Sequence, residues 1–173
     1  MKLATFVNTD GKAAIGVVDT VRKAILDLSA ASGGDADFRD MLALIDAGRA
    51  GLEKARAVAA NWPDAAVRPL AGTKLLAPLP EPRQMRDCLV FEAHLLNSRD
   101  QQAKRSGTEP PPIPDVWYEQ PVYYKGNRFS VVGPDHDVTW PHYSNHMDYE
   151  CEMACIIGKT GKDIAPADAM EHI

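Results

Sequence analysis

The sequence has few cysteines, and their arrangement is not that of a disulfide-rich or zinc-binding protein. Only three occur among 173 residues, Cys88, Cys151 and Cys155. An odd number without a histidine at zinc-ligand spacing argues against a disulfide framework and against a structural zinc site. We expect the three thiols to be small buried residues of a protein in the reducing cytoplasm.

Long apolar runs and basic clusters are also absent. No stretch has the length of a membrane span, and Asn8, Asp10 and Gly11 interrupt the first residues too early for a signal peptide. The formal net charge is −5, and lysine and arginine form no cluster, which argues against a nucleic-acid surface. A hydrophobic fraction of 45% and a charged fraction of 25% are those of a globular protein with a buried core. We therefore expect neither membrane nor nucleic acid among the partners of this protein.

Residues 1–73 are predicted to form a small α+β domain. Asp10 and Gly11 are a hairpin-turn signal between two apolar segments. The three segments with strand character are residues 2–7, 14–19 and 24–29. Apolar residues at helical spacing then predict two helices, over residues 37–48 and 51–62. This part of the chain contains no cluster of polar residues that indicates a site.

Residues 74–173 are predicted to form the first part of a second, β-rich domain. Three prolines mark its entry, and a helix is expected from Asp87, as its N-cap, to Gly107. The proline-rich residues 108–127 are interpreted as a loop packed on its own protein, with an extended ligand for another domain as the alternative. The later segments with strand character are residues 128–134, 137–141 and 147–158. A helix that opens at Pro166 ends after barely two turns, so we expect this chain to be a fragment of a longer one.

Three acidic residues alternate in the segment MDYECEMACIIG, residues 147–158. In a strand, Asp148, Glu150 and Glu152 would share one face. They could line the solvated face of an edge strand, where charges are favourable. The same face continues with apolar residues, however, and carboxylates that enter a buried sheet need a positive partner. A divalent cation is the alternative, because hard oxygen ligands select Mg²⁺, Ca²⁺ or Mn²⁺. The residues alone leave both readings open.

Asp87 and His94 form a second polar element. Seven positions, or two helical turns, separate them, so both would lie on one face of the expected helix. Asp87 could also be only a cap, and His94 only a surface side chain. By itself this pair therefore does not indicate a site.

Together these segments resemble the fumarylacetoacetate hydrolase family. The segment RDCLVFEAH is similar to the family's Asp-to-His segment, and PVYYKGNRFSVVG to its substrate-side strand. The E-x-E pair in MDYECEMACIIGKTGKDIAPADAMEHI resembles the family's signature strand, hairpin and following helix. The resemblance covers residues 74–173 and implies an α+β fold. A β-rich, mixed-sheet catalytic domain, incomplete here, would follow the small N-terminal domain, and members of the family are usually homodimers.

The resemblance implies a metal site and a catalytic base. Asp87, Glu150 and Glu152 would be ligands of Mg²⁺, or alternatively of Ca²⁺ or Mn²⁺. A further aspartate of the family follows the position at which this sequence ends. His94 would be the general base that activates water.

Two further residues match substrate contacts of the family. Tyr124 matches a tyrosine that contacts the substrate, and Arg105 matches a substrate arginine if one residue is inserted. Some members carry a glutamate three positions after the histidine as its partner, and this sequence has Asn97 there. The partner of His94 is therefore left open.

The implied function is metal-dependent hydrolysis of a carbon–carbon bond. The substrate would be a small anionic oxo acid of the β-diketone or acylpyruvate type, whose two oxygens chelate the cation. The same site also serves decarboxylases, hydratases and isomerases of 2-oxo acids in this family. A third reading is a non-catalytic binding or structural fragment, because residues that the family supplies further downstream are not in this chain.

Overall fold

The first two strands form a hairpin whose turn is fixed by an asparagine side chain. β1 (Lys2–Val7) and β2 (Ala13–Asp19) pair antiparallel along their length. The Oδ1 atom of Asn8 accepts hydrogen bonds from two backbone N–H groups of the connecting loop, both at 3.0 Å. Gly11 adopts a φ of 75°, which lies in the left-handed region that glycine tolerates best. The hairpin predicted from the Asp-Gly signal is confirmed.

Two short strands complete an antiparallel sheet in the order β1-β2-β3-β4. These are β3 (Ala24–Asp27) and β4 (Val67–Pro69). The predicted third strand is two residues too long, because its last residues already belong to α1 (Leu28–Ala31). Asp27 ends the strand and caps the helix, since its Oδ1 accepts a hydrogen bond from the N–H of Ala30 at 3.0 Å.

Two helices follow, as predicted, but their boundaries differ from the prediction. The first predicted segment is divided into a 3₁₀ turn (Ala36–Phe38) and α2 (Met41–Asp46). Asp40 starts α2 as its N-cap, with Oδ1 2.8 Å from the N–H of Ala43. α3 (Gly48–Ala59) then begins three residues before the predicted segment. A second 3₁₀ turn, Asp64–Ala66, leads into β4.

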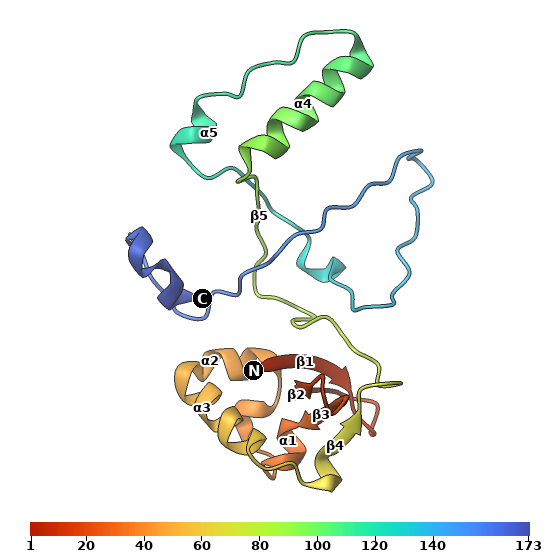
Figure 1. Cartoon of the computed structure of the whole chain (residues 1–173), viewed down its shortest axis with the longest axis vertical. Coiled ribbons are helices and arrows are strands. Elements are labelled where there is room, and N and C mark those ends of the chain that lie inside the picture. Colours follow the sequence, from red (N-terminus) through yellow and green to blue (C-terminus); the bar gives the residue numbers. More distant parts are fainter. The chain divides into compact units, whose positions relative to one another are not determined.

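The sheet carries a core on each face, because successive strand residues point to opposite sides. Figure 1 shows α1, α2 and α3 on one face, where most of the buried apolar side chains lie. The buried residues of this larger core are Ile15, Val17, Leu26, Leu28, Phe38, Met41, Leu44, Ala55 and Ala66. A smaller cluster of Phe6, Ala14 and Ile25 lies on the opposite face, and Leu70 and Leu75 pack against it.

The outer edge of β1 is covered by the chain that leaves the sheet. Leu75 forms an antiparallel bridge with Phe6, and the N–H of Leu76 donates to the carbonyl of Thr5 at 2.9 Å. The hydroxyl of Thr5 donates to the carbonyl of Pro78 at 2.7 Å. The edge strand is therefore protected from pairing with another chain.

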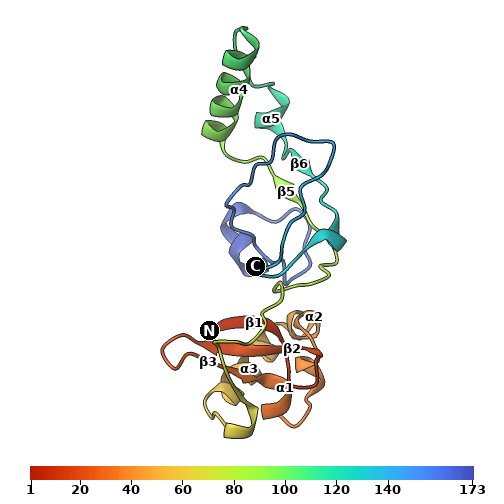
Figure 2. The ribbon, with the colours of Figure 1, turned by 90° about the vertical axis from the view of Figure 1, so that its right-hand side faces the viewer.

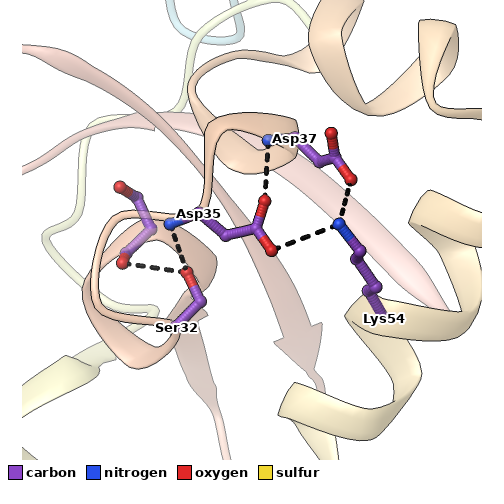
Figure 3. A network of polar contacts seen from close by, with 5 residues as sticks. Ser32, Asp35, Asp37 and Lys54 are labelled. Carbon is purple, nitrogen blue, oxygen red and sulfur yellow. Dashed lines mark hydrogen bonds and ion pairs between the residues drawn. The ribbon is translucent and has the colours of Figure 1, made fainter.

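A lysine joins two of the helical elements on the surface. The Nζ of Lys54 in α3 donates to Oδ2 of Asp37 at 2.5 Å and to Oδ2 of Asp35 at 3.4 Å (Figure 3). The pKa of Asp35 lies below its usual range. The largest cause is the hydrogen bond from the backbone N–H of Asp37, and the charge and hydrogen bond of Lys54 contribute less. Because these side chains are partly exposed, we expect the ion pairs to add little to stability.

The structure is a computed structural model that describes all residues from Met1 to Ile173. It divides into two compact units: Met1–Pro80 with Val132–Ile173 forms one, and Glu81–Val131 forms the other. The division into domains at residue 73 stays a prediction. No helix combines the length and apolar character that crossing a membrane requires.

In the unit Glu81–Val131, two short strands pair with each other, and the residues between them form an excursion of the chain that contains two helices. β5 (Asp87–Cys88) is followed by α4 (Glu92–Ser106) and α5 (Val116–Glu119). β6 (Tyr123–Tyr124) then returns to pair antiparallel with β5. In both views α5 lies beside α4 (Figures 1 and 2). A 3₁₀ turn, Arg128–Ser130, follows β6.

The prediction that Asp87 caps the helix is wrong. Asp87 lies in β5, and α4 begins only at Glu92, with Phe91 at the N-cap position and no side-chain hydrogen bond there. The pairing of β5 with β6 keeps this backbone extended, and the N–H of Leu89 continues the ladder by donating to Val122 O at 2.9 Å. The predicted end of the helix is confirmed, since Gly107 is its C-cap with a φ of 66°.

The three strands predicted after residue 127 are not formed. Residues 132–165 contain no helix or strand, and the 3₁₀ helix Pro166–His172 stands where the last helix was expected. A hairpin at Gly158 is also absent, because no strand lies on either side of it; the N–H of Gly158 donates to the carbonyl of His172 at 2.8 Å. A strand needs main-chain partners on a neighbouring strand, and no strand of this structure pairs with residues 147–158.

Residues 147–158 are exposed, so they do not form the strand of a buried sheet that was one of the two interpretations of this segment. Tyr149 is 87% exposed and Met153 is 93% exposed. All three cysteines are exposed, so the prediction of buried thiols is wrong as well. Without neighbouring strands, the alternating apolar side chains have no layer to pack against.

We predict that Gly16→Ala destabilises the sheet. A Cβ at this position would lie 2.5 Å from Leu26 O and 2.6 Å from Ile25 Cγ2. Because a backbone oxygen cannot move aside as a flexible side chain can, the free energy of unfolding should fall by about 1–3 kcal/mol. Urea denaturation followed by circular dichroism measures this change. Gly158→Ala is the control, since nothing lies within 4 Å of that position; equal stability of the two variants would contradict the prediction.

We also predict that Asp40 contributes stability only when it is ionised. The N–H of Ala43 and, after it, the Arg39 side chain hold the pKa of Asp40 below its ordinary value. A carboxylate with a lowered folded pKa stabilises the fold above its unfolded pKa, and this stability is lost as pH falls through the folded pKa. The thermal midpoint of Asp40→Asn should lie below that of the wild type at neutral pH and approach it only as the pH falls through the folded pKa of Asp40, which lies below the ordinary 3.8. Asp10→Asn, in the exposed hairpin turn, should follow the wild type throughout, and a constant gap for Asp40→Asn would refute the assignment.

Candidate functional site

Two of the predicted site residues are brought together by the short strand pair. Asp87 in β5 and Tyr124 in β6 are direct cross-strand partners. Residues opposite each other in an antiparallel pair project to the same face, so the carboxylate and the phenol share one side of the ladder. Both side chains are exposed. Their sequence separation of 37 positions is closed by the excursion through α4 and α5.

His94 is the third residue of α4, in the first turn of the helix. It is seven residues after Asp87, as the sequence suggested, but extended backbone and not helix fills most of this interval. The two residues therefore do not share a helix face, which corrects the sequence-based placement. His94 is exposed, and the next residue, Leu95, is one of two buried residues of α4. Asn97 follows one turn later in the same helix and is exposed as well.

Trp117 and Tyr118 contact the start of α4 and the residues just before it. The sequence did not identify either residue as part of a functional site. The Nε1–H of Trp117 donates to the carbonyl of Leu89 at 2.8 Å, and the hydroxyl of Tyr118 donates to Oε1 of Glu92 at 2.6 Å. Their rings meet edge to face, with centroids 4.8 Å apart. These two residues lie in the short helix α5, and their hydrogen bonds join it to residues of the same chain; the interpretation of the whole stretch as a packed loop stays a prediction. A tryptophan next to a tyrosine after a proline-rich run was the available signal.

Arg105 lies near the opposite end of α4 from His94. Eleven positions separate them in one helix, which corresponds to about 16 Å at a rise of 1.5 Å per residue. A substrate small enough to chelate one cation does not extend over this distance. The substrate contact of Arg105 stays a prediction, and the helix does not bring it to His94.

The two glutamates of the E-x-E pair lie in the other unit. Glu150 and Glu152 belong to a segment without regular structure, and both are exposed. In neither unit do three histidine, cysteine or acidic side chains form a group that could hold a metal ion. The predicted ligands are the three carboxylates of Asp87, Glu150 and Glu152, and carboxylate oxygens fit a hard divalent cation. Their assembly around such an ion stays a prediction.

The comparison with known families identifies the second half of the chain. The family model described as fumarylacetoacetate (FAA) hydrolase C-terminal matches residues 90–173. The matched range includes His94, Arg105, Tyr124 and both glutamates of the E-x-E pair, and Asp87 lies three residues before it.

Similar proteins extend the match toward the N-terminus. The human protein named oxaloacetate tautomerase FAHD2A, mitochondrial, is 31% identical over 136 residues, which are 78% of this chain and 38% of the relative. An uncharacterized protein of Pyrococcus abyssi is 32% identical over 71 residues, 41% of this chain and 28% of the relative. A crystal structure from Mycobacterium smegmatis, described as that of an HpcE protein, aligns with a TM-score of 0.54 at 24% identity. It covers 82% of this chain and 41% of that one, and shows a similar fold.

The chain belongs to the fumarylacetoacetate hydrolase family. It spans about two fifths of the human relative and of the mycobacterial chain. The predicted α+β class is confirmed, with small antiparallel sheets. A β-rich mixed sheet and a separate N-terminal domain stay predictions.

We predict that Glu92→Gln lowers the pKa of Tyr118. The hydrogen bond to the Glu92 carboxylate is the main cause that raises this phenol pKa above its ordinary value, because ionised tyrosine would face a negative acceptor. Glutamine can accept the same hydrogen bond but carries no charge, so the pKa should move back toward about 10. An NMR titration of the tyrosine ring signals measures the shift. Glu119→Gln is the control, because Glu119 lies next to Tyr118 in α5. An unchanged Tyr118 titration in Glu92→Gln would disprove this cause.

Proposed function

We propose that this protein is part of a divalent-metal-dependent enzyme that hydrolyses a carbon–carbon bond in a small oxo acid. The substrate is of the β-diketone or acylpyruvate type. The observation that supports this most directly is the β5–β6 ladder, which sets Asp87 opposite Tyr124 and leads within seven residues to His94. Membership of the fumarylacetoacetate hydrolase family supports the same class of reaction.

Three carboxylates are proposed to hold the cation, Asp87, Glu150 and Glu152. When bound, a divalent cation would polarise the carbonyl groups of the substrate and favour the enolate that carbon–carbon cleavage produces. Mg²⁺ is our first choice, with Ca²⁺ and Mn²⁺ as alternatives, because all three prefer oxygen ligands. The segment that carries the two glutamates is exposed in this structure.

His94 and Tyr124 are proposed to act directly on the substrate and its water. The imidazole of His94 would take a proton from water so that hydroxide attacks the carbonyl carbon. Tyr124 shares its face of the ladder with Asp87, so its hydroxyl can orient a substrate oxygen beside the metal ligand. Arg105 would contact the substrate only if it reaches back along α4.

Tautomerisation of an oxo acid is the second candidate reaction. The human relative is named an oxaloacetate tautomerase. Asn97 stands one turn after His94, where some members carry a glutamate partner of the histidine, and an amide cannot take the proton that a carboxylate would. Tautomerisation moves a proton within the substrate without attack by water, so it would not require a carboxylate at the position of Asn97. Decarboxylation and hydration belong to the same group of alternatives.

Assembly and location form part of the proposal. Large apolar side chains are exposed after residue 132, among them Trp140 at 52% and Ile157 at 66%. Such surface is usually covered by further protein, and a homodimer would provide it. The cytoplasm remains the proposed location.

We predict that Glu150→Gln weakens binding of Mn²⁺ to the protein by about tenfold or more, because it removes a charged ligand. Calorimetric titration measures the affinity, and assays with acylpyruvates and oxaloacetate distinguish cleavage from tautomerisation by their products. Glu171→Gln is the control, since Glu171 is exposed and forms an ion pair with Lys159 at 3.6 Å. If Glu150→Gln binds Mn²⁺ and turns over substrate as the wild type does, the metal assignment is wrong. Binding of Mn²⁺ without any turnover would favour the non-catalytic reading.

A further inference from the structure

The helix that carries His94 begins without a side-chain cap. Phe91 is at the N-cap position and cannot accept a hydrogen bond from the first turn. The first bond within the helix runs from the N–H of Leu95 to the carbonyl of Phe91, at 3.2 Å. An uncapped first turn frays easily, and His94 lies in it. Something other than local capping must therefore fix the position of this side chain.

α5 supplies two hydrogen bonds to this region. Trp117 binds the carbonyl of Leu89 at 2.8 Å, two residues before the N-cap, and Tyr118 binds the carboxylate of Glu92 at 2.6 Å, the first residue of the helix. The N–H of Leu89 is already bonded to Val122. Both main-chain groups of Leu89 are thus satisfied by residues that follow α4 in the chain.

The segment that precedes α5 is held against the body of α4. The guanidinium of Arg99 donates to the carbonyl of Pro111 at 3.0 Å and also to that of Pro112. These prolines belong to the segment that returns from the end of α4 to α5. Proline residues restrict the backbone, so the returning segment is stiff and delivers α5 to one place.

We propose that Trp117 and Tyr118 are positioning residues that fix His94 for catalysis. They act through the backbone at Leu89 and through Glu92, and they do not touch the substrate. The inference rests on the proposed function, because it takes His94 to be the catalytic base. Misplacement of a base by about 1 Å lowers the rate by up to about 100-fold, so the pair would control turnover more than substrate binding.

The test compares Tyr118→Phe with two substitutions of its acceptor. Tyr118→Phe and Glu92→Ala each remove the hydrogen bond, while Glu92→Gln keeps an acceptor. We expect the first two to speed amide exchange at Leu95 and to shift the ring signals of His94 in NMR spectra, and Glu92→Gln to resemble the wild type. Tyr143→Phe is the control, because Tyr143 is 83% exposed and lies in the other unit.

Kinetics separate positioning from a merely structural role. In an active protein, Tyr118→Phe and Glu92→Ala should lower kcat by about 10-fold to 100-fold with little change in KM, and Glu92→Gln should restore most of kcat. Unchanged exchange at Leu95 and unchanged His94 signals in Tyr118→Phe would overturn the inference. Altered exchange with an unchanged kcat would also overturn it, since the pair would then be structural only. Absence of turnover in the wild type would reject the proposed function, and the NMR comparison would still decide whether α5 holds His94.

Discussion

The pairing of residues 87–89 with residues 122–124 is the interaction on which the candidate site depends. It is short, with two paired positions in β5 and β6 and one further main-chain hydrogen bond at Leu89. It nevertheless closes an excursion that contains a 15-residue helix, and it sets Asp87 beside Tyr124. A two-stranded ladder is marginally stable alone. Contacts elsewhere in the excursion must therefore support it, and α5 provides them through Trp117 and Tyr118.

The same requirement for main-chain partners explains why the two ends of the sequence behave differently. Residues 1–80 contain every strand that their sheet needs, and even the edge of β1 is bonded by residues that follow the sheet. Residues 147–158 have the alternating pattern of a strand but find no neighbour within this chain. Their carboxylates and apolar side chains then stay exposed together. A pattern of side chains specifies which face a strand would bury. The segment becomes a strand only when a neighbouring strand pairs with it.

Local signals in the sequence predicted local structure well. The Asp-Gly hairpin, the two helical segments of the N-terminal half and the end of α4 at Gly107 were all identified from turn, periodicity and cap residues. The start of α4 differs from the prediction, since an aspartate at the head of an apolar segment has the pattern of an N-cap, whereas Asp87 pairs with a residue 37 positions later. That pairing depends on a contact remote in sequence, which no local pattern encodes. The resemblance to the family depends on the spacing of Asp87, His94 and the E-x-E pair along the sequence. This spacing is the same whether Asp87 lies in a helix or in a strand.

The hydrogen bonds around α4 bear on how one metal site can serve several reactions. Under the proposed function, hydrolysis would require His94 to face a water molecule, while tautomerisation would require it to face a carbon or oxygen of the substrate. The identity of the base does not choose between these outcomes, but its position relative to the carbonyl does. In this chain that position is set by the start of an uncapped helix, and the contacts that fix it come from Trp117 and Tyr118 at the end of a proline-rich return. A change in the length or stiffness of that return would move α5, and with it His94. The segment between α4 and α5 is therefore where we expect reaction preference to be determined.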